Sequence, residues 1–414
     1  MLALGGLAVA WVVLVRRVPE AFLGLLLVAG PLESTTFGDR VASRLTAVAH
    51  VETSLTAIAL LGVLTSAGYH GWRRRNAAFQ APQSAIAFVL LMAMLLAASF
   101  HSPDPAGAFA KAMKFESITA LGFFAPLLII DGRRSLVRFA AAVAGIGFTI
   151  ALFATQTGHA SHPLTLPGSD SEIVVGEYAG LGLIAIVAIL WPLTPGLWRL
   201  LWAPPAAIML NALVGAGSRG ALLATTMAIV VALAFLLKHG KTRGPALAVV
   251  LAIGIAAPII WATSPPAARA KYLATVSVDQ ASQALNAGGG ERQEIVSAGV
   301  ALFRENPLGV GTAGYTKLTG FVWPHNIIVE LGAELGVVGI VLFLLIIAGV
   351  VARVAAPIRR GSTETLGAAV LALALLALSF SSFDLNGNRS MWLLLGVALA
   401  AGAQGAAPPR RAAR

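Results

Sequence analysis

Residues 323–339 read WPHNIIVELGAELGVVG and open a long apolar run that continues to Val350. The run predicts a membrane helix, yet its first turns carry His325, Asn326, Glu330 and Glu334. A charge in the middle of a membrane helix costs about 2.5–3.5 kcal/mol, so such side chains usually face a cavity or a partner. We therefore interpret this stretch as a candidate functional site within a transmembrane helix.

The order of residues in this stretch predicts how its polar groups are presented. Pro324 suits the start of a helix, where its missing N–H loses nothing. His325 would then lie at the positive end of the helix dipole, which favours the neutral imidazole. Asn326, Glu330 and Glu334 recur every four residues and should share one face.

Two glycines of the same helix, Gly332 and Gly336, form a G-x-x-x-G pattern. This pattern favours the close approach of a second helix. A structural polar stripe is the alternative interpretation, and a lone His325 would favour it. Two arginines elsewhere in the chain, Arg219 and Arg292, favour the functional interpretation instead.

Composition defines the class of protein. The chain has 414 residues, of which 57% are hydrophobic and 11% charged, and its mean hydropathy is +0.83. These values predict an all-α polytopic integral membrane protein. The absence of cysteine excludes disulfides, a thiolate nucleophile and cysteine metal ligands. The first fifteen residues lack a basic start and an A-x-A-like cleavage site, so we expect a retained span there.

Thirteen apolar runs are candidates for transmembrane helices. The first is short for a span of about 20 residues, and Gly30-Pro31 interrupts the second, so twelve helices are the alternative. The runs are residues 2–15, 21–37, 51–69, 84–100, 112–130, 136–155, 173–193, 197–215, 220–237, 245–263, 326–350, 363–383 and 390–406.

Basic residues set the orientation. Alternate loops and the C-terminal tail hold 18 of the 29 basic residues and 3 of the 18 acidic ones. Because basic loops stay in the cytoplasm, we place these loops there, and His325 on the opposite side.

The long segment before His325 should then be extracytoplasmic. We divide the chain into N-terminal transmembrane helices at 1–263, a periplasmic loop at 264–324, C-terminal transmembrane helices at 325–406 and a cytoplasmic tail at 407–414. Within the loop, residues 287–290 predict a turn and residues 291–306 an amphipathic helix, which residues 307–311 end.

Two arginines lie at expected helix starts on the outer side. Arg219 follows Gly215-Ala-Gly-Ser218, where Ser218 can cap a helix that begins at Gly220 or Ala221. Arg292 opens the amphipathic loop helix. A helix N-terminus with an arginine favours an anion. Contact with lipid head groups is the alternative for Arg219, and a surface ion pair with a neighbouring glutamate is the alternative for Arg292.

Other motifs are weak or missing. Lys114 lies at the outer start of a span, where a Lys–Glu pair could be structural. The remaining histidines have no spacing typical of a metal site, so we expect neither metal nor cofactor. The sequence has no phosphate-binding G-x-x-x-x-G-K and no G-x-S-x-G motif.

Two outward guanidinium groups suit a pyrophosphate, and a neutral His325 suits removal of a proton from a hydroxyl. Without ATP outside the cytoplasm, a pyrophosphate-linked lipid is the expected activated donor.

Three stretches together resemble the O-antigen ligase and polymerase superfamily over roughly residues 100–395. They are residues 217–220, residues 290–295 continuing to 306–311, and His325-Asn326 with Glu330 and Gly336.

That resemblance implies a GT-C-type helical fold and the roles of several residues. It implies metal-independent, inverting transfer of a glycan from undecaprenyl pyrophosphate to an acceptor hydroxyl at the periplasmic face of the inner membrane, with no nucleic-acid partner. It implies His325 as the catalytic base, and Arg219, Arg292 and, more loosely, Lys114 as donor ligands. Ser218, Asn326 and Glu330 would support the site.

The acceptor stays open at this stage. Transfer to lipid A–core, as in an O-antigen ligase, is the interpretation we favour. An O-antigen or exopolysaccharide polymerase and a protein O-glycosylase are alternatives within the family. A secondary transporter is the alternative from another class, but it would place charges near the bilayer midplane and show repeated halves.

Overall fold

The computed structural model describes residues 2–33, 54–73, 82–157, 163–166, 172–276, 289–382 and 384–406. Every regular element in these ranges is a helix, which confirms the all-α prediction, and each of the thirteen apolar runs overlaps a helix. The tail at 407–414 and the first two residues of the expected turn at 287–290 lie outside the described residues.

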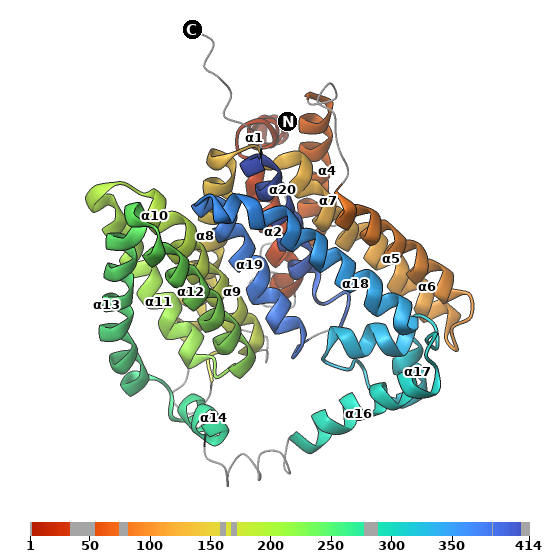
Figure 1. Ribbon diagram of the computed structural model, residues 1–414. Helices are drawn as coiled ribbons and strands as arrows, with labels where there is room; N and C mark the ends of the chain where they lie inside the picture. The colour runs from red at the N-terminus through yellow and green to blue at the C-terminus, as the bar shows by residue number, and fades with distance from the viewer. Residues whose placement is uncertain are drawn as a thin grey trace.

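The helices are labelled in Figure 1. In chain order they are α1 (Leu2–Arg17), α2 (Glu20–Glu33), α4 (Leu55–Arg73), α5 (Gln83–Ser99), α6 (Pro105–Lys114), η1 (Phe115–Thr119), α7 (Ala120–Ile129), α8 (Arg133–Thr157), α9 (Glu172–Ala185), η2 (Ile186–Leu190), α10 (Trp191–Leu193), η3 (Gly196–Trp202), α11 (Ala203–Gly215), α12 (Arg219–Lys238), α13 (Gly240–Thr263), α14 (Pro266–Val276), α16 (Gly289–Glu305), α17 (Gly314–Thr319), α18 (Ile327–Arg359), α19 (Thr363–Ser379) and α20 (Arg389–Ala406).

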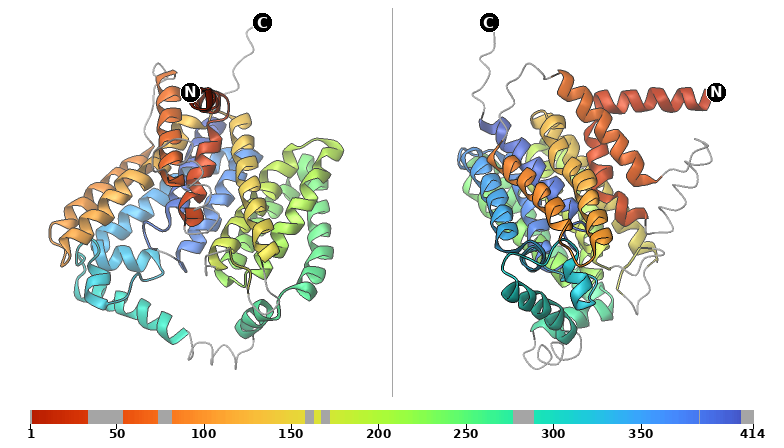
Figure 2. Two further views of the ribbon diagram at one scale, coloured as in Figure 1. Left: turned by 180° about the vertical axis from the view of Figure 1, so that it is seen from behind. Right: turned by 90° about the vertical axis from the view of Figure 1, so that its right-hand side faces the viewer.

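Seven helical stretches among the described residues are long and apolar enough to cross a membrane. They are Pro105–Ile129, Arg133–Thr155, Glu172–Leu193, Gly196–Gly215, Arg219–Lys238, Thr242–Thr263 and Ile327–Arg359. Helix α1 is different, because it lies crosswise to the bundle and projects from it (Figure 2). This placement favours the alternative of twelve spans, since α1 does not run alongside the other helices.

The two ends of the bundle differ. Helices α4, α12 and α18 all end on one side, with Arg73, Lys238 and Arg359 in their last turns. An ion pair between Arg133 Nε and Glu364 Oε1, at 3.2 Å, joins the starts of α8 and α19 on that side. Helices α14, α16 and α17 lie at the opposite end, at the bottom of Figure 1. The starts of α12 and α18 therefore belong to the end that carries the long loop.

Helix α9 is buried among its neighbours, and its three glycines allow other helices to approach closely. A Cβ on Gly176 would come within 2.9 Å of the Ala221 Cβ, so α9 and the first turn of α12 approach closely. Gly182 faces Gly147 of α8 on another side of the helix. These contacts fix α9 beside the start of α12, where the candidate residue Arg219 lies.

Candidate functional site

The candidate base His325 lies just outside helix α18. The helix begins at Ile327, and its N-cap is Asn326, whose Oδ1 accepts hydrogen bonds from the backbone N–H groups of Ile328 and Val329 at 3.0 and 3.2 Å. The expected start at Pro324 is therefore wrong by three residues, because the amide of Asn326 satisfies the first free donors. His325 has a φ of 52°, a left-handed conformation that few residues with a side chain adopt.

A tryptophan holds the imidazole of His325. The indole N–H of Trp323 donates to His325 Nε2 at 3.1 Å. Because an indole N–H only donates, this ring nitrogen carries no proton in that contact, and the imidazole is neutral with its proton on Nδ1. The nitrogen that can take up a proton is therefore the one that Trp323 contacts.

Arg219 is the first residue of α12 and is exposed, while the buried Ser218 is its N-cap residue. Helix α12 thus begins at Arg219, one residue before Gly220, which was the earlier of the two expected starts. Ser218 makes no side-chain capping bond, so the expected cap is present by position only. Helix α14 packs over the preceding loop, where Ala268 lies against Gly217, which has a φ of 69°.

The hydroxyl of Tyr272 on α14 anchors this contact. It donates to the backbone oxygen of Val214 at 3.1 Å. Burial raises the pKa of Tyr272, so the phenol remains a neutral donor at physiological pH. The loop that presents Arg219 is consequently held between α11 and α14.

The C-terminal end of α19 brings Arg219 and His325 to the same region. A Cβ on Gly220, the residue after Arg219, would come within 2.8 Å of Ser381 Oγ. Asn326, the residue after His325, donates from Nδ2 to the Phe380 carbonyl oxygen at 3.1 Å. Two residues that are neighbours in the chain, Phe380 and Ser381, thus contact both segments. The structure therefore places the two predicted site residues on either side of one turn.

Arg292 lies in the first turns of α16 and is exposed. Further along the helix, Ile295 packs with Tyr315 of α17 and Ala333 of α18, and the Tyr315 hydroxyl donates to the Ile295 carbonyl at 2.8 Å. Burial raises the pKa of Tyr315, which keeps this donor protonated. The amphipathic loop helix is therefore confirmed, and Arg292 lies about one turn before Ile295, near the start of α16. Helix α16 lies beneath the bundle in Figure 1.

The expected role of Gly336 in helix packing differs from what the structure shows. Helix α18 is interrupted at Gly336, with φ 66° and ψ −159°. The segment at 307–311 fills the break: Val310 N–H donates to the Ala333 carbonyl at 2.9 Å, and Val337 N–H donates to the Pro307 carbonyl at 2.9 Å. A Cβ on Gly336 would overlap the Pro307 carbonyl oxygen, so glycine is needed here for a loop and not for a helix.

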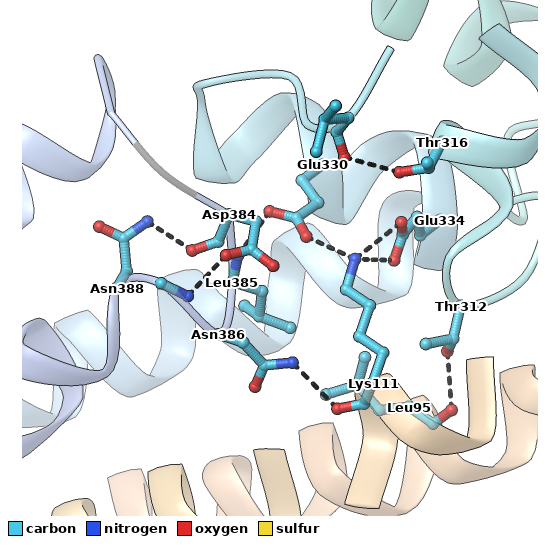
Figure 3. A network of polar contacts seen from close by, with 12 residues as sticks. Leu95, Lys111, Thr312, Thr316, Glu330, Glu334, Asp384, Leu385, Asn386 and Asn388 are labelled. Atoms are coloured by element: carbon cyan, nitrogen blue, oxygen red, sulfur yellow. Dashed lines mark hydrogen bonds and ion pairs between the residues drawn. The ribbon is translucent and has the colours of Figure 1, made fainter. Parts of the chain in front are cut away.

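Buried acidic and basic side chains form a network just inside the site (Figure 3). Lys111 Nζ lies 2.6 Å from Glu330 Oε1 and 2.7 Å from Glu334 Oε2. Both carboxylates are almost completely buried, and the Lys111 side chain is 14% exposed. The predicted shared face of Glu330 and Glu334 is confirmed, and its partner is a lysine of α6.

Sequence reasoning chose Lys114 in this region and missed Lys111. Lys114 is exposed, three residues from the lysine that enters the network. Both lysines lie in the same short stretch of an amphipathic helix, and only the ion pairs of Lys111 with Glu330 and Glu334 separate them. A donor-binding role for Lys114 stays a prediction.

The loop between α19 and α20 was also missed. Its Leu385 N–H donates to Glu330 Oε2 at 2.7 Å, and Asn386 Nδ2 donates to the Lys111 carbonyl at 3.0 Å. Asp384 adds a negative charge near Lys111 and accepts from the Gly387 N–H at 2.6 Å. The cluster of Asp, Asn and Gly residues between two spans was the available signal for this loop.

A family model matches the part of the chain that carries the two candidate arginines and the candidate base. The model of a family described as O-antigen ligase matches residues 204–344, which include Arg219, Arg292 and His325. This confirms the resemblance to the O-antigen ligase and polymerase superfamily. Together with the membrane helices, the match supports an O-antigen ligase/polymerase-type glycosyltransferase that acts on lipid-linked glycans in a bilayer. No curated protein matches the chain.

Proposed function

We propose that this protein transfers a glycan from undecaprenyl pyrophosphate to a sugar hydroxyl of an acceptor, with lipid A–core as the acceptor, at the periplasmic face of a bacterial inner membrane. The observation that carries the proposal is the contact of the α19 end with both Gly220 and Asn326. This contact brings the loop of Arg219 and the segment of His325 to the same turn of the chain. Both lie within the residues that the family model matches.

In this proposal, Arg219 and Arg292 bind the donor pyrophosphate. Both are exposed, and both lie at the start of a helix, where backbone N–H groups also favour an anion. A guanidinium group can bind a phosphate through two parallel hydrogen bonds. Anchoring of α16 on α17 and α18 limits where Arg292 can reach, and the donor would bridge the two arginines.

His325 would act as the general base. The acceptor hydroxyl oxygen attacks the anomeric carbon of the donor sugar while the bond from that carbon to the pyrophosphate oxygen breaks. The pyrophosphate leaves with the bonding electrons, and His325 Nε2 takes up the hydroxyl proton. Because Trp323 donates to the same nitrogen, the acceptor hydroxyl must replace the indole N–H. Attack opposite the leaving group inverts the configuration at the anomeric carbon.

Glu330 and Glu334 are poorly suited to this step. Glu330 has its oxygens engaged by Lys111 and the Leu385 N–H, and Glu334 shares the same lysine. Their positions deeper in α18 also keep them from an acceptor that enters at the surface. We assign them the role of fixing α18 relative to α6 and the α19–α20 loop.

The test uses purified protein in lipid nanodiscs with an undecaprenyl-pyrophosphate-linked glycan and lipid A–core. We expect an upward gel shift of the acceptor when both substrates are present, and a strongly reduced one with Arg219→Ala. Lengthening of the lipid-linked glycan without acceptor would identify a polymerase, and a shift only of an added protein would identify a protein O-glycosylase. Movement of the lipid across the membrane without transfer would overturn the proposal in favour of a transporter.

A further inference from the structure

A second acidic residue near the site is buried without a partner. Glu177 on α9 is 8% exposed, although it belongs to a membrane-spanning stretch. In the described part of the chain, its carboxylate makes no hydrogen bond or ion pair. A carboxylate that the fold does not engage can accept hydrogen bonds from a ligand or from water. Unlike Glu330, Glu177 is therefore available to bind a substrate.

The direction of Glu177 follows from its neighbours on α9. Gly176 faces the start of α12, because a Cβ there would come within 3.2 Å of the Ser218 Cβ. The Tyr178 hydroxyl donates to the Leu27 carbonyl at 2.7 Å and lies 3.3 Å from Ser390 Oγ. Successive helical residues are rotated by about 100°, so Glu177 faces the space between the starts of α12 and α20.

Arg389 opens α20 on that side. Its charge acts on the Glu177 carboxylate, yet the described residues give Arg389 no hydrogen bond or ion pair. The acid and the cation thus lie close together without contact, next to the loop of Ser218 and Arg219. A ligand with several hydroxyl groups suits such a pair, because it offers hydrogens to the carboxylate and oxygens to the guanidinium.

We propose that Glu177 and Arg389 bind the sugar that is directly attached to the donor pyrophosphate. This inference rests on the proposed function, in which Arg219 binds that pyrophosphate. The Glu177 carboxylate accepts hydrogen bonds from sugar hydroxyls, and the Arg389 guanidinium donates to sugar oxygens. The pair positions the sugar so that its anomeric carbon faces His325, and no bond to Glu177 forms.

The experiment compares two lipids with the full-length protein in nanodiscs. One is undecaprenyl pyrophosphate without sugar, and the other is the same lipid with its glycan. Glu177→Gln keeps the shape of the side chain but removes the charge. We expect its dissociation constant for the glycan-bearing lipid to rise about tenfold or more, with little change for the sugar-free lipid. Arg389→Gln should give the same selective loss.

The matched control is Glu20→Gln on α2. Glu20 is also buried, at 2% exposure, and one of its carboxylate oxygens has no hydrogen-bond partner in the described structure. Its position at the start of α2 keeps it out of the proposed sugar site, so both dissociation constants should stay as in the wild type. Thermal stability of each variant separates a failure to fold from a loss of binding.

Two results would overturn the inference. Equal weakening of both lipids by Glu177→Gln would place the residue at the pyrophosphate or in the fold, and unchanged binding of both would exclude a contact. Arg219→Ala tests the proposed function separately, because it should weaken both lipids. If it weakens neither while Glu177→Gln acts selectively, the sugar site stands and the pyrophosphate assignment fails.

Discussion

At the scale of single residues, the exposed guanidinium groups of Arg219 and Arg292 are the first to test. Each charge-assisted hydrogen bond to a phosphate contributes about 1.5–3 kcal/mol, so Ala in either place should reduce transfer about tenfold to a hundredfold or more. Lysine should restore little, because it lacks the planar two-bond contact. The measurement is the initial rate of acceptor modification at fixed donor, and full activity in both Ala variants would rule out the pyrophosphate assignment.

The backbone of His325 decides how its role is tested. Its left-handed conformation makes Ala a strained replacement, whereas Asn adopts this conformation readily. We expect His325→Asn to lower kcat about 10²- to 10⁴-fold while donor binding persists. Donor binding and transfer are measured in one preparation. Lost binding together with normal turnover at saturating donor would make His325 a pyrophosphate ligand instead.

Trp323→Phe provides the companion variant. It retains the aromatic ring but removes the N–H that holds His325 Nε2. Because the acceptor hydroxyl must replace this N–H on His325 Nε2, and a neutral hydrogen bond contributes about 0.5–1.5 kcal/mol, its removal should lower the KM for the acceptor roughly twofold to tenfold. Donor affinity should not change, because the indole contacts the base and not the pyrophosphate site.

At the scale of helices, the Lys111 network locks α6 to α18. Lys111→Met would leave two buried carboxylates without their cation, which costs about 3–5 kcal/mol. We therefore expect a large drop in melting temperature, partly restored by adding Glu334→Gln. Lys114→Met, a change of an exposed lysine on the same helix, is the control and should leave the melting temperature unchanged. Equal effects of both substitutions would exclude the network as a stabilising element.

The break in α18 gives a second prediction at this scale. Gly336→Ala introduces a Cβ against the Pro307 carbonyl and forces a side chain into a left-handed conformation. A loss of about 1–3 kcal/mol of stability is expected. Gly68→Ala on α4 meets nothing within 4 Å and should be neutral. Thermal unfolding in detergent compares the two, and an unchanged midpoint for Gly336→Ala would contradict the described contact with residues 307–311.

At the scale of the whole molecule, orientation can be tested with cysteine labelling, because the chain contains no native cysteine. Gly289→Cys lies at the end of the bundle with α14 and α16, and we expect it to react with an impermeant thiol reagent from outside intact cells. Arg134→Cys at the start of α8 should react only after permeabilisation. The reverse pattern would invert the topology and place the site in the cytoplasm.

Sequence periodicity was sufficient for the helices of this molecule and insufficient for their contacts. Apolar runs locate the helices because burial in lipid demands them, and Arg219, Arg292 and His325 are recognisable because charge is rare in such runs. The helix start at Asn326 and the break at Gly336 depend on competing caps and on a distant loop. Lys111, Leu385 and Glu177 gain their places only through tertiary packing, which no spacing along the chain encodes.

The Lys111 network also bears on the order in which the protein is made. Lys111 precedes Glu330 and Glu334 by about two hundred residues, so a chain inserted from its N-terminus already has the cation in the bilayer when the two acids are synthesised. The segment at 307–311 likewise emerges before the break that it fills. Leu385, the last partner of Glu330, follows later. Glu330 and Glu334 therefore enter the lipid after their cation, and the last hydrogen bond to Glu330 can form only when the loop between α19 and α20 has been translated.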